Sequence, residues 1–191
     1  SNATVTITAV NDAPSINSAS LADVNETDTN PPGASITSLF SGSFSDPDTG
    51  SSLFGLAIVS NTEVAGRGTW QYNPPSGNSN DWYNVGTVND TGTALVLRAD
   101  TLIRFLPSGS YDGPVVALSV RALDDSYGGG FSDKVTGAES RVTVDTTTNG
   151  DPTAIAATAR ALNTNVTGVN DTPVISTNST LTVNQGNAIF I

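Results

Sequence analysis

A short motif that occurs twice fixes the length of the unit that has to fold. Val-Asn-Asp-Ala-Pro at residues 10–14 returns as Val-Asn-Asp-Thr-Pro at residues 169–173, 159 positions later. The same distance separates Val-Asn-Glu at 24–26 from Val-Asn-Gln at 183–185. Self-similarity at a fixed spacing is the sequence signature of an array of repeats. The spacing therefore predicts a repeating unit of about 159 residues.

The two copies of the motif also predict where the segments of the chain begin and end. The first three residues, Ser-Asn-Ala, are typical of a scar left by tag removal and are set aside. The apolar residues after the second motif need a sheet edge to pair with, so we expect residues 174–191 to pair with this domain or a neighbouring chain. The expected segments are a tag scar at 1–3, the last strand of a preceding repeat at 4–10, one complete repeat at 11–169 and the start of the next repeat at 170–191.

Between the two copies, short runs of alternating apolar and polar residues are separated by turn residues. Ile103 and Phe105 flank Arg104, so the two apolar side chains share one face of a strand. Many short strands with turns between them indicate an all-β fold, here an antiparallel sandwich of two sheets. Only residues 154–162 have the composition of a helix. The expected strands are Ser20–Asn25, Ala34–Phe40, Phe54–Ser60, Gly68–Asn73, Trp82–Val85, Thr93–Ala99, Leu102–Leu106, Val115–Leu123, Ser140–Thr147 and Leu162–Val169.

The composition excludes several classes of function. The chain has no His and no Cys, which removes thiol nucleophiles, Cys/His metal sites, disulfides and Ser-His-Asp catalysis. A net charge of −11 argues against nucleic acid as a partner, because phosphate binding needs a basic surface. No apolar run is long enough to span a membrane. Asp124 and Asp125 are adjacent and so face opposite ways on a strand, which leaves no pair of catalytic carboxylates. We expect no enzyme.

Aspartates gather at particular places in the sequence. Asp46 and Asp48 lie in one turn, Asp124 and Asp125 end a strand, and Asp12 belongs to the repeated motif. Carboxylates that point into one small volume repel each other unless a cation with oxygen ligands is bound, and calcium is the usual one. The simpler alternative is that each aspartate makes a local turn and is solvated. The joint pattern favours calcium.

In this respect the chain resembles the cadherin-like tandem repeats of large bacterial surface adhesins and type I-secreted proteins. The resemblance covers residues 4–191 and implies a Greek-key, immunoglobulin-like β-sandwich of about seven core strands with extra hairpins. It rests on motifs in a fixed order. These are Val-Asn-Asp-Ala-Pro at 10–14, Phe-Ser-Asp-Pro-Asp-Thr-Gly at 44–50, Gly-Thr-Trp-Gln-Tyr at 68–72, Trp82 with Val85, Ile-Arg-Phe-x-Pro at 103–107, Tyr-Asp-Gly at 111–113 and Ser-Val-Arg-Ala-Leu-Asp-Asp at 119–125.

The resemblance further implies calcium at the junctions between successive repeats, where it stiffens a rod. We expect the protein outside the cell at the bacterial surface, with neighbouring repeats as partners and possible contacts to like molecules or host surfaces. The implied ligands at the N-terminal junction are Asn11, Asp12, Asp46 and Asp48 with Asp124 or Asp125; those at the C-terminal junction are Glu26, Asn170 and Asp171, with Asp112 as a further candidate.

Four aromatic residues offer an alternative function. Trp70 and Tyr72 share a strand face, and Trp82 and Tyr83 follow closely in the sequence. Exposed together, they would form a platform on which sugar rings stack, and the domain would bind glycans. Aromatic side chains are more often buried in cores, and this favours the core for Trp70.

Overall fold

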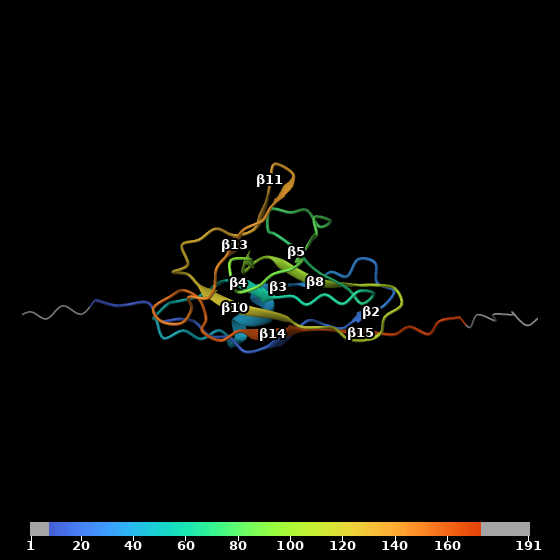
Figure 1. Cartoon of the computed structure of the whole chain (residues 1–191), viewed down its shortest axis with the longest axis horizontal. Helices are drawn as coiled ribbons and strands as arrows, with labels where there is room; N and C mark the ends of the chain where they lie inside the picture. The colour runs from blue at the N-terminus through green and yellow to red at the C-terminus, as the bar shows by residue number, and fades with distance from the viewer. Residues whose placement is uncertain (1–7, 173–191) are drawn as a thin grey trace, which may run out of the picture.

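Residues 8–172 are described by a computed structural model, in which the chain is mostly β with one short helix. Most of the expected strand at 4–10 and the expected pairing of residues 174–191 lie outside the described residues. The two ends of the described chain lie at opposite ends of the long axis (Figure 1). None of the helices in this part is long and apolar enough to cross a membrane.

The largest sheet has six strands in the order β1-β14-β10-β4-β7-β13. Its central strands are buried on both faces, since Leu56 and Ile58 of β4 enter the main core while Ala57 and Val59 enter a second one. The strands are β1 (Ala19–Ser20), β4 (Leu53–Ser60), β7 (Ala94–Arg98), β10 (Leu118–Asp124), β13 (Thr143–Val144) and β14 (Arg160–Asn163).

A second sheet has four antiparallel strands in the order β3-β8-β5-β6. The predicted alternation is confirmed in β8, where Ile103 and Phe105 enter the main core and Arg104 stacks on Trp82 outside it. The main core also contains Trp70 and Tyr72, so it joins residues of this sheet to residues of the six-stranded one. The strands are β3 (Ala34–Ser35), β5 (Gly68–Asn73), β6 (Tyr83–Asn84) and β8 (Leu102–Pro107).

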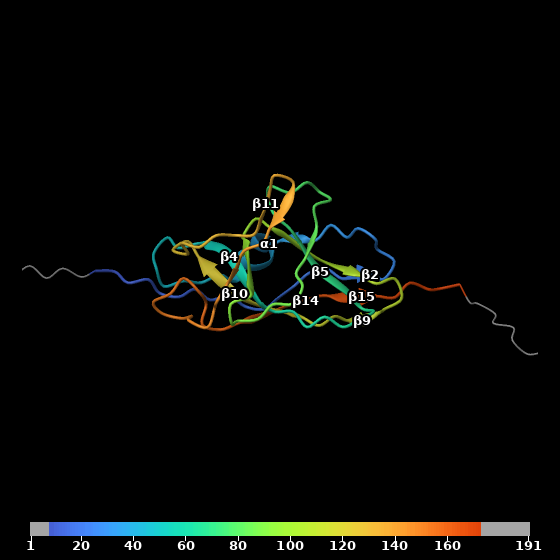
Figure 2. The same cartoon turned by 45° about the horizontal axis from the view of Figure 1, so that its top comes forward.

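A three-stranded sheet in the order β2-β15-β9 lies toward the C-terminal end of the domain (Figure 2). Here the prediction of purely antiparallel sheets is wrong, because β2 runs parallel to β15, as β1 does to β14. The reason is topological: the first and last strands both run from the N-terminal end of the molecule to the C-terminal end. The strands are β2 (Val24–Asn25), β9 (Gly113–Pro114) and β15 (Asn165–Thr167).

A separate hairpin projects from the body of the domain (Figures 1 and 2). It consists of β11 (Asp133–Val135) and β12 (Ala138–Ser140), joined by Thr136 and Gly137. Both turn residues have positive φ, 50° and 87°, as a two-residue turn that matches strand twist requires.

The local structure differs from expectation at two places. The strand expected over 34–40 ends at Ser35, and α1 (Ile36–Phe40) follows, continued by η1 (Ser41–Ser43). Ser35 caps this helix by accepting a hydrogen bond from the Ser38 amide, and Ile36 and Phe40 face the core four residues apart.

The helix expected over 154–162 does not form. The Asp124 amide instead donates to the Ala154 carbonyl, and the Ala156 amide donates to the Ala122 carbonyl, before β14 begins at Arg160. Pairing with β10 therefore satisfies the backbone groups that a helix would have used. In all, residues 8–172 form fifteen strands where ten runs were expected, because the runs at 20–25 and 162–169 are each divided into two strands and strands such as β9 and β11 were not expected.

Candidate metal sites at the two ends of the domain

At the N-terminal end, the linker residues contact the acidic segments with which they were predicted to lie. The Asn11 side-chain amide donates to Asp124 Oδ2 at 3.3 Å and to the Thr153 carbonyl at 3.1 Å. The Asp12 backbone amide donates to Asp48 Oδ2 at 2.8 Å. Residues 11 and 12 are thus fixed against the turn at 46–48 and the end of β10.

The turn that carries Asp46 and Asp48 is joined to Asp125 through one hydroxyl group. Asp46 Oδ1 accepts from the Asp48 amide at 2.8 Å, a local bond of the kind that shapes aspartate turns. The Ser51 hydroxyl lies 3.0 Å from both Asp46 Oδ2 and Asp125 Oδ1. These carboxylates therefore shape the loop, and they also bring it to the end of β10.

Asp124 is the most deeply buried acid of this end, with no exposed surface. A register shift between Leu123 and Asp124 interrupts the pairing of β10 with β4 at this point. Asp124 Oδ1 accepts from the Ser126 amide at 2.8 Å and from the Ser126 hydroxyl at 2.5 Å. Asp125 is exposed and lies in the turn directly after β10, so the two neighbouring acids have different environments.

Sequence reasoning missed one acid of this end, Asp151. Its Oδ1 accepts a hydrogen bond from the Ala13 amide at 2.6 Å, next to the linker aspartate. The available signal was the dipeptide Asp-Pro, which occurs here and at Asp46. Partial desolvation, followed by repulsion from Asp48, Asp151 and Asp46, raises the pKa of Asp12 above its usual value.

None of these acids forms an ion pair with a basic side chain of residues 8–172. The ion pairs of this part of the chain are Arg121–Asp90, Lys134–Asp81 and Arg141–Glu139, all elsewhere. Backbone amides and hydroxyl groups separate the carboxylates, and no three acids of the described chain converge on one point as in a closed metal site. Because the donors are all oxygen atoms, the set suits a hard cation such as Ca²⁺.

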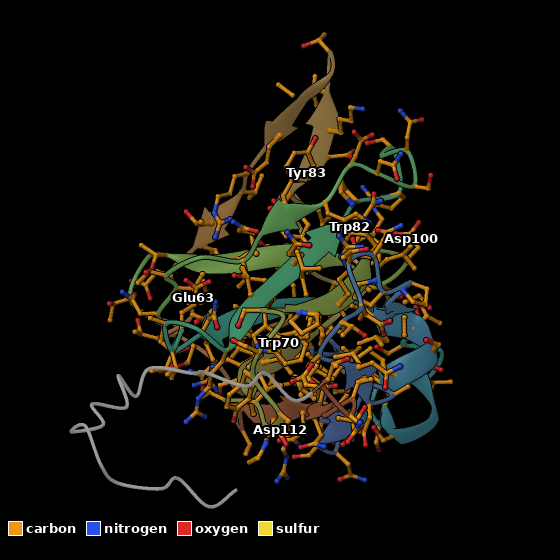
Figure 3. The ribbon with its side chains drawn as sticks, turned by 90° about the vertical axis from the view of Figure 1, so that its right-hand side faces the viewer. Glu63, Trp70, Trp82, Tyr83, Asp100 and Asp112 are labelled. Atoms are coloured by element: carbon orange, nitrogen blue, oxygen red, sulfur yellow. The ribbon has the colours of Figure 1, made fainter. Side chains whose placement is uncertain are left out.

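At the C-terminal end, the structure brings together part of the predicted set. Glu26 is 7% exposed, and its Oε1 accepts from the Val169 amide at 2.6 Å. Asp112 lies against Gly168, where an added Cβ would stand 3.1 Å from Asp112 Oδ2; Figure 3 looks onto this end of the domain. Asn170 and Asp171 are exposed, and within the described residues neither makes a side-chain hydrogen bond to Glu26.

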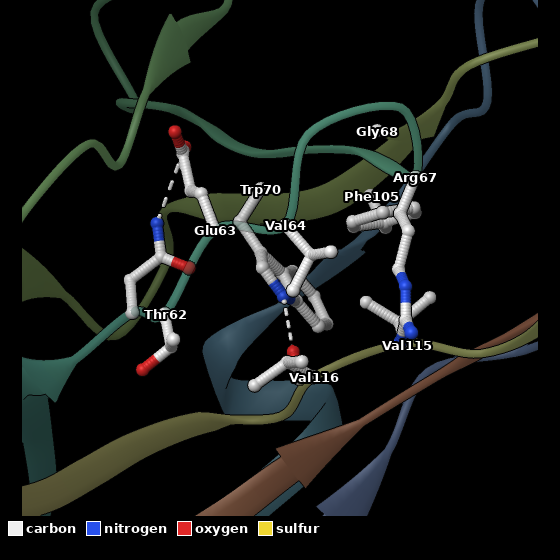
Figure 4. Close-up of a pocket in the computed structure, with 10 residues that line it drawn as sticks. Thr62, Glu63, Val64, Arg67, Gly68, Trp70, Phe105, Val115 and Val116 are labelled. Carbon is white, nitrogen blue, oxygen red and sulfur yellow. Dashed lines mark hydrogen bonds between the residues drawn. The ribbon is translucent and has the colours of Figure 1, made fainter.

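Two of the four aromatic candidates lie in the core. Trp70 is 2% exposed, and its indole nitrogen donates to the Val116 carbonyl at 3.0 Å (Figure 4). Tyr72 has no exposed surface, and its hydroxyl donates to Glu139 at 2.5 Å. Burial, together with this hydrogen bond, raises the pKa of Tyr72 well above its usual value.

The other two aromatic candidates are half-buried. The Arg104 guanidinium lies 3.9 Å from the centre of the Trp82 ring, so one face of the indole is covered. The Tyr83 ring packs against Tyr72 at 5.8 Å between centroids. In Figure 3, Trp82 and Tyr83 lie apart from Trp70. The four residues therefore do not form one exposed platform for sugar stacking.

Comparison of the chain with protein-family models, with curated proteins and with solved structures finds no match.

Proposed function

We propose that this chain is a structural repeat of an extracellular bacterial adhesin, which binds Ca²⁺ at its junctions with neighbouring repeats and thereby stiffens a multi-domain rod. The observation that carries the proposal is the docking of the linker residues Asn11 and Asp12 on acids from the turn at 46–48 and from the end of β10. These segments are distant in sequence, and none of their acids forms an ion pair with a basic side chain of the described chain.

The proposed architecture is a cadherin-like Greek-key β-sandwich. It is supported by one core that joins the six-stranded and four-stranded sheets. The parallel pairing of the first and last strands departs from a purely antiparallel arrangement, and it carries the chain from one end of the domain to the other (Figure 1). A domain of this shape can be joined end to end with copies of itself, as the repeated motif indicates.

The acids of the N-terminal end have distinct roles in such a site. Bound calcium would supply the positive charge that these residues lack. Asp124 is held rigidly by Ser126, and Asp48 holds the linker through the Asp12 amide. Partial desolvation, together with repulsion from the neighbouring carboxylates, raises the pKa of Asp12. Six to eight oxygen ligands surround Ca²⁺ in proteins, and carboxylates, the Asn11 side chain and backbone carbonyls provide oxygens of this kind.

Stiffening follows from where these groups are attached. The linker and the body of the domain both contribute, so a cation that bridges them removes the freedom of the hinge. Extracellular calcium modules bind with a Kd of roughly 10⁻⁴–10⁻³ M, which matches calcium outside cells. At ten times Kd, one site adds about 1.4 kcal/mol to the free energy of unfolding.

A thermal titration of the chain tests the calcium site. We expect calcium to raise Tm by about 3–6 °C, the shift that 1.4 kcal/mol gives for a domain of this size. Asp12→Asn removes a repelled charge, so we expect the variant to have a higher Tm than the parent in EDTA. It also removes a calcium ligand, so we expect calcium to raise its Tm by less than that of the parent. Asp23→Asn, the same change at an exposed acid, is the control and should follow the parent.

A two-repeat protein tests the rod. Its radius of gyration, measured by small-angle scattering, should rise toward that of an extended arrangement as calcium is added. If neither Tm nor the radius of gyration responds to calcium at several times the extracellular concentration, the proposal is wrong. In this role the domain spaces and presents other parts of the adhesin, with neighbouring repeats as its partners, and performs no catalysis.

A further inference from the structure

Two acids flank the point at which the chain leaves the domain. β15 is the central strand of the three-stranded sheet and leads into the second copy of the motif. Glu26 directly follows β2, which runs parallel to β15. Asp112 directly precedes β9, which runs antiparallel to β15. The directions of the strands therefore place both acids at the end of β15, on either side of the departing chain.

Glu26 contacts this departing chain through both its backbone and its side chain. Its amide donates to the Thr167 carbonyl at 3.0 Å, which extends the parallel pairing of β2 with β15. Its Oε1 then accepts from the Val169 amide at 2.6 Å, two residues further along. The Glu26 carboxylate thus continues the hydrogen-bond ladder between β2 and β15 by one more bond, in the place of a backbone carbonyl of β2.

The charge of Glu26 has no counterpart in this contact. Glu26 is 7% exposed, and none of the three ion pairs of residues 8–172 involves it. The second copy of the repeat supplies an independent observation, because Val-Asn-Glu at 24–26 corresponds to Val-Asn-Gln at 183–185. Gln185 has the same length and the same side-chain carbonyl oxygen as Glu26, without the charge. The two copies therefore share a hydrogen-bond-accepting oxygen at the same distance from the backbone.

We propose that Glu26 is a positioning residue, a clamp that holds the Val169 amide and so fixes the direction in which the next repeat leaves. The clamp depends on the length of the side chain and on the position of its acceptor oxygen rather than on its charge. This deepens the proposed function, because it assigns the direction of the linker to the end of the preceding repeat. It does not depend on calcium.

Amide hydrogen exchange of Val169, measured by NMR in EDTA, tests the clamp. Glu26→Gln keeps the reach and the acceptor, and we expect its protection to remain within about threefold of the parent, the difference between a charged and a neutral acceptor. Glu26→Asp keeps the charge but is one methylene shorter, and Glu26→Ala has no acceptor. Both should exchange at least about tenfold faster, as expected for the loss of one hydrogen bond to a charged group.

The amide of Val120, in the middle of β10, serves as the internal control for folding and should be equally protected in all three variants. Asp23→Asn controls for the loss of one negative charge nearby and should leave Val169 unchanged. If Glu26→Asp stays protected while Glu26→Gln exchanges as fast as Glu26→Ala, charge rather than reach holds the linker and the inference is overturned. Unchanged protection in Glu26→Ala would also refute it. Failure of the calcium proposal would appear separately, as a missing Tm response in the parent protein.

Discussion

Replacing Tyr72 with Phe removes one hydroxyl group from the core and tests how the projecting hairpin is attached to the body. Tyr72 lies on β5 with no exposed surface, and its hydroxyl donates to Glu139 Oε1 on β12 at 2.5 Å. This bond joins the four-stranded sheet to a hairpin that has no other strand beside it in the described structure. The phenyl ring of the variant fills the same space, so the change isolates the hydrogen bond.

The magnitude follows from the surroundings of the two partners. A hydrogen bond to a charged group contributes about 1.5–3 kcal/mol. The Glu139 side chain is 33% exposed and lies 3.4 Å from Arg141, so water and this arginine compensate part of the loss. We therefore expect the lower end, about 1.5 kcal/mol. For a domain of this length that corresponds to a fall in Tm of about 3–6 °C.

The assay is urea unfolding combined with a double-mutant cycle. Tyr72→Phe, Glu139→Ala and the double variant should give a coupling energy of about 1 kcal/mol or more. Tyr83→Phe, the same chemical change on the neighbouring half-buried ring, should cost less than about 0.5 kcal/mol. A coupling energy near zero, or equal effects at Tyr72 and Tyr83, would refute the reasoning, because the Tyr72 hydroxyl would then not stabilise the attachment of the hairpin.

Three further predictions test the core, the ion pair and a turn. Leu97→Ala should cost about 2–5 kcal/mol in urea unfolding, because Leu97 is fully buried, whereas the same change at Leu102, 36% exposed, should cost less than about 1 kcal/mol. Hydrogen bonding to Arg121 lowers the pKa of Asp90, so this carboxylate stabilises the fold above pH about 4, and the stabilisation is lost as pH falls through its lowered pKa. Asp90→Asn should consequently lower Tm at pH 7 and have a shrinking effect at acid pH; a constant difference would contradict this. Gly33→Ala should destabilise by about 1–3 kcal/mol, since Gly33 has a φ of 70° and an added Cβ would lie 2.5 Å from a carbonyl oxygen of β8.

The strand positions could be predicted wherever one face of a strand is apolar and the other is not. β8 shows this alternation, and it was expected within one residue of its observed bounds. β4 was found for a different reason, because Leu56 to Val59 form a continuous apolar run that serves two cores. The short helix at 36–40 could not be predicted from periodicity, because five residues make little more than one turn. Its signal was the cap, Ser35, which also suits a strand end.

Long-range pairing was beyond local sequence patterns. Nothing in the residues of β1 or β2 says that they run parallel to strands about 140 residues later. The same limit explains Asp151, which meets the linker only because the chain after the hairpin returns to the N-terminal end. Asn11, Asp12, Asp46, Asp48 and Asp124 were expected together only on the resemblance to a repeat family, since composition and spacing contain no topology; in the structure, hydrogen bonds join Asn11 to Asp124 and Asp12 to Asp48.

The two ends of the domain hold the chain in different ways, and this difference bears on how an array would be built. At the N-terminal end, several carboxylates accept hydrogen bonds from the incoming linker, and desolvation together with their mutual repulsion raises the pKa of Asp12. At the C-terminal end, one buried acid accepts a backbone hydrogen bond from the departing linker. Under the proposed function, two repeats would meet at these ends, the end with uncompensated charge would gain most from a cation, and the end with the ladder-like bond would set the direction. We therefore expect the affinity for calcium to follow substitutions at the N-terminal end of the later repeat, and the angle between repeats to follow substitutions at Glu26 of the earlier one.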